Sequence, residues 1–403
     1  MPNMDTDFSG PGGLDIQKQA HHWAGVARGL APMIEAAGER TERERKVPKD
    51  VMQALHEAQL FRLLMPRSLN GCEADPLSYM QVLEEISAAD ASTGWCLGQG
   101  LGCSIAAAYL DHAIAAEIFD TPDGVLAWGP PTTAKAIKVD GGYRVTGHWR
   151  FASGSPNCTW FGGQSEVCEA DGTPAKDDKG RSISRIMLFP AASAEIINVW
   201  DVIGLRGTGS DDYAVKDLFV PEAYTMWRDH QPDRREFGPL YSIPILTMYG
   251  MGFSGVALGI ARTVLEEFMK VAEGKTARGM SKPLCENAVI QSQTAQAVAR
   301  LQSGRAFLVQ MIKEFYGASV AGGEFPLDLR AKLRISITWS MQQAKDVVDF
   351  CYHAAGTNAI FEKNPFERRF RDIHTVTQQG QAHATNFEFA GQALYGKTPG
   401  HRL

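Results

Sequence analysis

The sequence predicts an α+β protein in which two helical regions flank a β domain. Three changes of pattern support this prediction. Apolar residues have mainly helical spacing over residues 17–118, alternate with polar ones in several segments of 124–220, and return to helical spacing after Pro244. We therefore expect an N-terminal helical domain at residues 1–123, a central β domain at 124–235 and a C-terminal helical bundle at 236–403.

In the first region, Pro48 suits the opening turn of a helix, and the small and apolar residues from Trp95 to Leu110 predict a buried one. Three glycines lie inside the second stretch, and each costs a helix roughly 1 kcal/mol relative to alanine. Close approach of another backbone or of a ligand would explain them, and so would a break in the helix. The sequence leaves both explanations open for Gly98, Gly100 and Gly102.

The central region contains a hairpin signal. Lys135–Val139 alternates in polarity, Gly141 and Gly142 supply a turn, and Tyr143–Phe151 resumes the alternation. Further strands are expected at residues 185–190, 196–199 and 213–220, and a surface turn at 171–181. Long amphipathic helices are then expected at residues 256–271, 286–316 and 327–352.

Composition indicates a soluble globular protein. Hydrophobic residues make up 44% and charged residues 21% of the 403, and a net charge of −6 offers no attraction for nucleic acid or a membrane surface. The seven cysteines are an odd number without a CxxC pair, so we expect reduced thiols in the cytoplasm, no disulfide framework and no metal site. We expect neither a signal peptide nor a membrane span, because the apolar stretches are too short.

Three segments carry the most specific signals. Phe151-Ala152-Ser153-Gly154 follows a predicted strand, Gly204–Ser210 is a glycine-rich turn around an arginine, and Pro365–Ile373 groups arginines and acids among aromatics after a Gly356-Thr357-Asn358 turn. With the order of helical, β and helical regions, they resemble the acyl-CoA dehydrogenase fold over nearly the whole chain. The closer likeness is to its oxygen-using branch, the two-component flavin-dependent monooxygenases.

The resemblance implies a set of flavin-binding residues. Ser153 matches the position whose hydroxyl hydrogen-bonds the flavin N5 edge, and arginines suit the flavin phosphates. The full set is Trp128, Ser153, Gly154, Arg206, Thr208, Ser210, Gly356, Thr357 and Arg369, with Gly356, Thr357 and Arg369 expected to act across a subunit boundary. Structural alternatives stay open: Ser153 closing a turn, Arg206 in solvent, and an arginine–carboxylate network that includes Arg371.

The segment expected to hold a catalytic base departs from both branches of the fold. Acyl-CoA dehydrogenases commonly place a carboxylate shortly after the Arg-Asp pair, whereas residues 373–387 contain no acid. The monooxygenases usually have a histidine where Gln379 stands and another near Cys103, and glutamine cannot act as a general base. We expect Gln379 and Cys103 to face the substrate. His383 could replace the missing histidine, since residues four apart on a helix share a side.

The resemblance favours a monooxygenase. Reduced flavin, FMN or FAD, would come from a separate NAD(P)H-dependent flavin reductase, react with oxygen to form a C4a-hydroperoxide, and oxygenate a small aromatic or cyclic substrate. The alternatives are a flavin dehydrogenase or oxidase acting on a thioester or small carbon acid, and a catalytically silent flavin-binding member. Family likeness also implies a homotetramer, with surplus apolar positions on one long helix at Val298, Leu301, Phe307, Leu308 and Met311.

Overall fold

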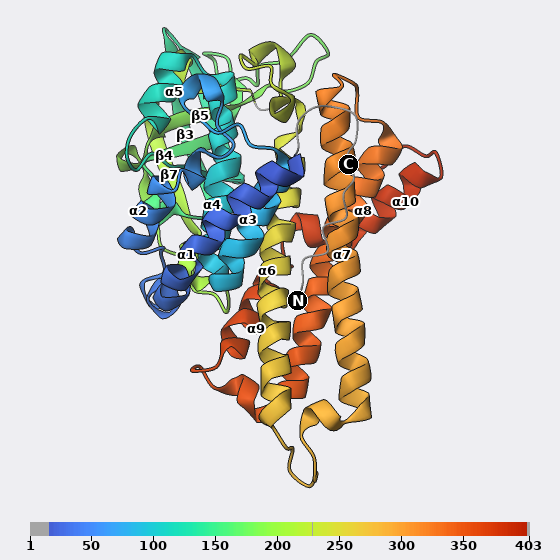
Figure 1. Ribbon diagram of the computed structural model, residues 1–403. Helices are drawn as coiled ribbons and strands as arrows, with labels where there is room; N and C mark the ends of the chain where they lie inside the picture. The colour runs from blue at the N-terminus through green and yellow to red at the C-terminus, as the bar shows by residue number, and fades with distance from the viewer. Residues whose placement is uncertain (1–15, 228, 401–403) are drawn as a thin grey trace.

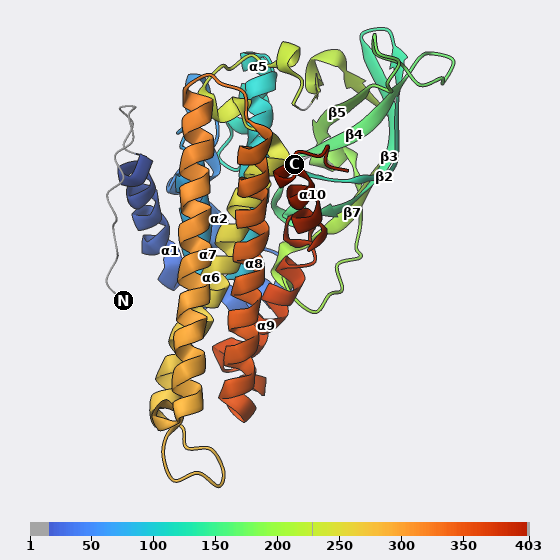
Figure 2. The ribbon, with the colours of Figure 1, turned by 90° about the vertical axis from the view of Figure 1, so that its right-hand side faces the viewer.

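The computed structural model describes residues 16–227 and 229–400. The helices before the sheet are α1 (Ile16–Glu44), α2 (Lys49–Glu57), α3 (Pro76–Ala89), α4 (Ala91–Ser104) and α5 (His112–Phe119). Those after it are α6 (Ile245–Gly274), α7 (Ala288–Val320), α8 (Leu327–Ala355), α9 (Pro365–Val376) and α10 (Thr385–Leu394). Figure 1 shows α6 running between the N-terminal helices and the long C-terminal ones, and Figure 2 shows the strands gathered on one side of α8 and α10.

The strands form one mixed sheet. They are β1 (Leu126–Gly129), β2 (Pro131–Val139), β3 (Gly142–Ala152), β4 (Trp160–Cys168), β5 (Ser184–Pro190), β6 (Glu195–Ile197), β7 (Asp211–Pro221) and β8 (Thr225–Met226). The spatial order is β6-β7-β3-β2-β4-β5-β8, with β1 paired to β4. The predicted hairpin is confirmed, because Ala136 of β2 stands opposite Val145 of β3. Aromatic rings of Trp149, Phe161 and Tyr213 fill a core on one face.

The helices before and after the sheet share one hydrophobic core. Leu83 of α3 and Val256 of α6 belong to the same buried cluster. The glycines of α6 allow this close packing, because a Cβ at Gly255 would overlap the α3 backbone. Glu85 of α3 accepts hydrogen bonds from Arg28 of α1 (2.7 Å) and from Arg262 of α6 (2.8 Å), which links three helices at the edge of the core. The helices on the two sides of the sheet in the chain are therefore packed into one core.

The glycines of α4 are explained by close approach, not by a break. The α-helix runs unbroken from Ala91 to Ser104, and a 3₁₀ turn follows at Ile105–Tyr109. A Cβ on Gly102 would overlap the ring of Tyr249, and one on Gly98 would lie 3.2 Å from Phe253. Small residues on α4 thus make room for aromatic rings that project from α6.

The three long C-terminal helices occur as predicted, at α6, α7 and α8. Among the described residues α6 is long and apolar enough to cross a membrane, but 89% of its apolar window is buried inside the protein, so it is a core helix. The apolar positions of α7 have partners within the chain. Leu308 and Met311 are fully buried, and Val298, Leu301 and Phe307 pack against the same core. They are not a surplus that requires another subunit.

Candidate active site

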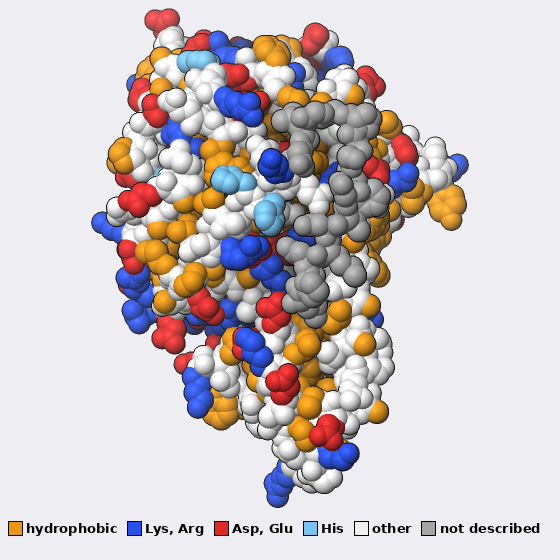
Figure 3. All heavy atoms as spheres, viewed as in Figure 1, with side chains coloured by type: hydrophobic (Ala, Val, Ile, Leu, Met, Phe, Trp, Pro, Cys, Tyr) orange, Lys and Arg blue, Asp and Glu red, His pale blue; other side chains and the backbone are white. Residues whose placement is uncertain are grey.

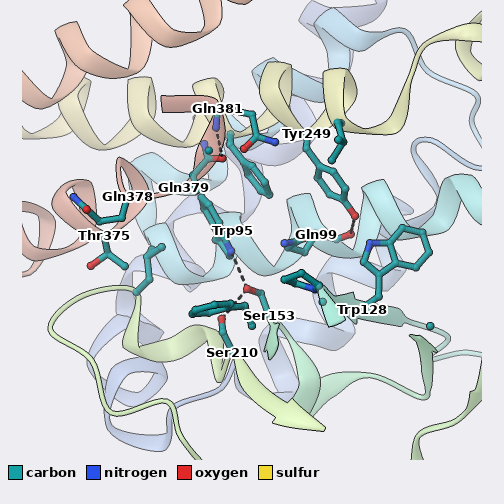
Figure 4. Close-up of a pocket in the computed structure, with 18 of the residues that line it drawn as sticks. Trp95, Gln99, Trp128, Ser153, Ser210, Tyr249, Thr375, Gln378, Gln379 and Gln381 are labelled. Carbon is teal, nitrogen blue, oxygen red and sulfur yellow. Dashed lines mark hydrogen bonds between the residues drawn. The ribbon is translucent and has the colours of Figure 1, made fainter. Parts of the chain in front are cut away.

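A cavity of about 570 Å³ lies between the sheet, α4, α6 and the segment that follows α9. Figure 4 shows side chains from all four converging on it. The sheet side contributes Trp128, Phe151, Ser153 and Ser210; α4 contributes Trp95 and Gln99; α6 contributes Tyr249 and Phe253; and the segment after α9 contributes Gln378, Gln379 and Gln381.

Two bulky residues reach the cavity from left-handed backbone. Phe151 has φ 58° beside the register shift between Trp149 and Ala152, and Leu205 has φ 51°. Such conformations cost on the order of 1–3 kcal/mol and persist only where the surroundings hold them. Leu205 is held by Asp372 of α9, whose carboxylate accepts from Leu205 N at 2.6 Å. Burial of that carboxyl group raises the pKa of Asp372 to about 7.

A chain of hydrogen bonds runs behind the sheet-side wall. The Trp95 indole Nε1 donates to Ser153 Oγ (3.0 Å), and Ser153 and Ser210 share a hydrogen bond of 2.7 Å (Figure 4). Ser210 and Thr208 share another of 2.7 Å, and Thr208 Oγ1 donates to the Leu205 carbonyl (2.9 Å). All three hydroxyls are buried. We call the four residues Trp95, Ser153, Ser210 and Thr208 the hydroxyl relay.

The two ends of the hydroxyl relay set its direction. An indole N–H only donates and a carbonyl only accepts. Thr208 gives its proton to Leu205 O, so Ser210 donates to Thr208 and Ser153 donates to Ser210. Ser153 has then used its proton and one lone pair. What it presents to the cavity is a second lone pair, which accepts a hydrogen bond.

The helix side of the cavity is a wall of parallel rings. Trp95 of α4 and Phe253 of α6 stack at 3.9 Å between ring centres with an interplanar angle of 8°. Tyr249, one turn earlier on α6, continues the stack at 5.4 Å and 13°. Trp200 also lines the cavity, and its indole Nε1 donates to Leu205 O (3.0 Å). These rings give the cavity an aromatic lining against which a flat ligand can pack.

The polar side chains of the cavity are uncharged. Beside the hydroxyls of Ser153, Ser210, Thr375 and Tyr249, the lining carries five carboxamides, from Gln99, Gln164, Gln378, Gln379 and Gln381. Gln379 is fixed by its neighbours, since its Oε1 accepts from Gln381 N (3.1 Å) and its Nε2 lies 3.6 Å from the sulfur of Met341. Gln99 Oε1 is buried without a hydrogen-bond partner among the described residues.

Comparison with known proteins assigns the family. The models "Acyl-CoA dehydrogenase, N-terminal domain" and "Acyl-CoA dehydrogenase, C-terminal domain" match residues 18–117 and 251–384. An indole-3-acetate monooxygenase of Pseudomonas putida is 31% identical over 360 residues, which cover 89% of this chain and 90% of that protein. The chain is a flavin-dependent monooxygenase of the acyl-CoA dehydrogenase fold.

Other members of this monooxygenase family match along the whole length. The flavin-dependent monooxygenase oxygenase subunit HsaA of Mycobacterium tuberculosis is 27% identical, covering 96% of this chain and 98% of that one. The fold also matches the structure of XiaF from Streptomyces sp. in complex with FADH2 and glycerol, with a TM-score of 0.88, 20% identity, and coverage of 96% of this chain and 98% of that one. The predicted family and α+β fold class are thus confirmed.

The cavity fits the ring system of the flavin that this monooxygenase family uses. It offers flat aromatic walls, a buried acceptor at Ser153 and enough volume for a tricyclic ring with space beside it. Trp128, Ser153 and Ser210, which the sequence singled out for the flavin, line the cavity together. Thr208 lies behind them in the relay, and Gly154, with φ 83°, donates from its N to Thr208 O at 2.8 Å.

The arginines expected near flavin phosphate lie outside the cavity. Arg206 pairs with Glu42 at 3.4 Å and is part of the surface. Arg369 is buried and donates to the carbonyl of Ala88 at 3.0 Å, with burial lowering its pKa. Arg371 joins Glu42 and Glu367 (2.7 and 2.8 Å), as the structural alternative anticipated. Within one chain Arg369 and Arg371 hold α9 against α3 and α1, and Arg206 holds the glycine-rich turn against α1.

Gly356 and Thr357 lie at the opposite end of α9 from the cavity. They form a 3₁₀ turn after α8, where Gly356 adopts φ 54° beside Lys275. Thr375 lies ten residues along α9 from Pro365, the end nearer this turn, which is a rise of about 15 Å. In a single chain the turn is therefore remote from the cavity that Thr375 lines.

Two expectations for catalytic residues differ from the structure. Cys103 is buried behind Tyr249, with Sγ 3.4 Å from the tyrosine hydroxyl, and does not line the cavity. His383 is exposed, and its Nδ1 lies 2.8 Å from Thr385 Oγ1. The expectation that His383 shares a helix side with Gln379 is wrong, because α9 ends at Val376 and Gln379 caps the N-terminus of a separate 3₁₀ turn.

Sequence reasoning missed several lining residues. Trp95, Gln99 and Tyr249 lie in helices whose apolar character predicts only burial, and nothing local distinguishes a core ring from a cavity wall. The signal present was the glycine spacing of α4, which marks the helix face that other rings approach. The run Gln378-Gln379-Gly380-Gln381 was noted for its lack of an acid, not for its carboxamides.

Proposed function

We propose that this monooxygenase is the oxygenase component of a two-component system. It takes reduced flavin from a separate NAD(P)H-dependent flavin reductase and uses oxygen to oxygenate a small aromatic or cyclic molecule. The observation that carries the proposal is the direction of the hydroxyl relay, which leaves Ser153 as an acceptor at the cavity. The reduced flavin ring has an N–H at N5 and the oxidised ring has none, so this acceptor favours the reduced form.

Bound reduced flavin would supply the electrons that activate oxygen. The chain's own residues would position the ring and exclude water. Ser153 would accept from the N–H at N5, and Trp95 and Phe253 would cover a face of the reaction space. Gln379, held by Gln381 N, can donate or accept a hydrogen bond but cannot remove a proton.

The dehydrogenase alternative has less support. Removal of a proton next to a thioester requires a base. Among the described residues that line the cavity there is no carboxylate and no histidine. Oxygenation of an electron-rich ring carbon needs no prior deprotonation, so a cavity of carboxamides and hydroxyls is compatible with it. A catalytically silent flavin-binding protein would not need the hydroxyl relay or a cavity with space beside the flavin ring.

We extend the proposal to features of the working enzyme. The flavin is FMN or FAD, and its phosphates lie outside the aromatic part of the cavity, toward the arginines of a neighbouring subunit. The enzyme is a homotetramer in which the turn at Gly356 and Thr357 of one chain serves the flavin of another. We assign it to the cytoplasm, in keeping with free thiols at every cysteine.

Flavin retention is the test. We expect the protein to purify colourless and to bind reduced FMN or FAD more tightly than the oxidised form in anaerobic titration. It should then consume oxygen at a rate different from that of free reduced flavin. Purification with tightly held oxidised FAD that an acyl-CoA reduces would replace the proposal with the dehydrogenase. Flavin binding without any change in the oxygen reaction would favour the silent alternative.

A further inference from the structure

We infer that the substrate is an uncharged, planar aromatic molecule with an N–H or O–H donor and no carboxylate. The inference rests on the proposed oxygenase function and narrows it to a substrate class. It is carried by the charge, the shape and one unsatisfied polar atom of the cavity.

The cavity lining differs from the outer surface because its described residues include no acidic or basic side chain. The face of the molecule in Figure 3 carries both acidic and basic side chains, scattered among uncharged ones. By contrast, no Lys, Arg, His, Asp or Glu is among the described residues that line the cavity. A substrate carboxylate would find carboxamides and hydroxyls as its partners, but no cation.

Charged groups that touch the lining residues already have partners outside the cavity. Arg150 lies over the Phe151 ring, 5.0 Å from its centre, pairs with Asp212 at 3.7 Å and is not among the lining residues. Asp372 lies behind Leu205 and accepts from its N. Neither reaches the cavity as a free charge, and neither supplies a cation for a substrate carboxylate.

The physical consequence is discrimination against anions. Moving a carboxylate from water into an apolar, water-excluding site costs several kcal/mol unless a cation or several N–H donors compensate. Carboxamides supply donors without charge and recover part of this cost. A neutral ring avoids the cost and gains apolar contact with the aromatic side chains of the lining, among them Trp95 and Phe253.

Gln99 indicates the polar group of the ligand. Its carboxamide lies one helical turn after Trp95, at the cavity, and its Oε1 is buried without a partner among the described residues. A buried acceptor left unpaired costs about 1–3 kcal/mol, so a ligand that donates to it recovers that energy. A ring N–H or a hydroxyl meets the requirement, and a carboxylate, which only accepts, does not.

The test compares two rings that differ by one carboxymethyl group. Indole is neutral and carries an N–H, and indole-3-acetate adds a carboxylate. Equilibrium dialysis of the full-length protein, with and without reduced FMN under anaerobic conditions, gives both dissociation constants. We expect indole to bind at least about tenfold more tightly than indole-3-acetate, in line with the cost of an uncompensated charge.

A cation placed in the cavity should reverse this preference. Gln99→Lys should bind indole-3-acetate more tightly than the parent does and indole less tightly, by severalfold each. Gln53→Lys is the matched control, because Gln53 is exposed on α2 and the same charge there should change neither constant. Thermal unfolding of each variant verifies that it is folded, and the comparison within the parent decides the inference even if Gln99→Lys does not fold.

Equal or tighter binding of indole-3-acetate by the parent would overturn the inference. So would the binding of neither ring. Reduced-flavin binding, measured in the same samples, tests the proposed oxygenase function independently of the substrate class. If flavin binds and the acid is preferred, the oxygenase stands and the substrate class is wrong; if flavin does not bind either, the proposed function falls as well.

Discussion

Ser153 shows how much a single hydroxyl depends on residues far away in the chain. Its indole donor, Trp95, is 58 residues upstream and its hydroxyl partner, Ser210, is 57 residues downstream. The Phe-Ala-Ser-Gly motif places a serine after a strand, but the relay alone decides whether that serine offers a proton or a lone pair. The motif therefore predicts the contact, and the tertiary structure determines its polarity.

Ser153→Ala should weaken binding of reduced flavin by severalfold to about tenfold, because one neutral hydrogen bond contributes about 0.5–1.5 kcal/mol. Oxidised flavin should be affected less, since its N5 has no proton to give. Anaerobic titration of both forms measures the two changes. Ser155→Ala is the matched control: Ser155 is buried nearby, donates to Gly209 O at 2.8 Å and does not line the cavity. Equal losses in the two variants would place Ser153 away from the flavin.

His383→Ala should leave the pH profile of oxygen consumption with reduced flavin unchanged. Histidine is the side chain that most often titrates between pH 5 and 8, but His383 is exposed and bonded to Thr385, outside the cavity. Rates from pH 5.5 to 8.5 in parent and variant provide the measurement. A step near neutrality that disappears in the variant would show that His383 enters the site in the working enzyme.

Asp372→Asn tests the carboxyl group that holds Leu205. Its folded pKa of about 7 lies above the value of roughly 3.9 of an unfolded aspartate. The protonated form is thus favoured by folding, so its contribution is full below about pH 4 and is lost as pH rises through about 7. Asparagine keeps an acceptor without the titration. The Tm of the variant should therefore rise relative to that of the parent between pH 5 and pH 8, by the equivalent of roughly 2–3 kcal/mol.

A constant difference in Tm between pH 5 and pH 8 would contradict this assignment. Asp50→Asn is a suitable control, since that carboxylate is exposed and paired with Arg40, which keeps its pKa low. Its effect on Tm should be small and flat over the same range.

At the scale of elements, sequence periodicity is reliable where one face of an element is buried. The hairpin of β2 and β3 and the helices α6, α7 and α8 occur as predicted, because alternation and helical spacing report the side that faces a core. The four-residue spacing of Gln379 and His383 does not place them on one helix face, because α9 ends at Val376 and Gln379 begins a separate 3₁₀ turn. The packing of α4 against α6 determines which buried rings face the cavity. This packing cannot be predicted from a local sequence pattern.

Gly102→Ala should disturb that packing. A Cβ there overlaps the Tyr249 ring, and overpacking a well-filled core typically costs about 1–3 kcal/mol. The Tm should fall, and ligand binding should weaken because Tyr249 lines the cavity. Gly29→Ala on α1 is the control, because nothing lies within 4 Å of a Cβ at that position. It should stabilise the protein by up to about 1 kcal/mol, and a loss at both positions would indicate a general intolerance of α-helical alanine here.

At the scale of the molecule, exposed apolar side chains predict assembly into an oligomer. Exposed apolar side chains occur on the bundle and the turn after α8, with Trp339 40%, Phe361 53% and Ile360 61% exposed. We expect light scattering at micromolar concentration to give four times the mass of one chain, and Phe361→Asp to shift the mass downward. A monomeric mass for the parent protein would contradict the proposed tetramer. It would also contradict the proposed role of Gly356 and Thr357 in the flavin site of a neighbouring chain.

The shared core of α3 and α6 has a consequence for synthesis on the ribosome. Glu85 is translated 177 residues before its partner Arg262, which at about 5–20 residues per second is a delay of roughly 10 to 35 s. During that interval α3 can pack against α1, whose Arg28 already pairs with Glu85, but it lacks α6 and the second cation, Arg262. The nascent N-terminal helices must therefore wait in an incomplete state, and this is the stage at which a chaperone that shields apolar helices would have the most to protect.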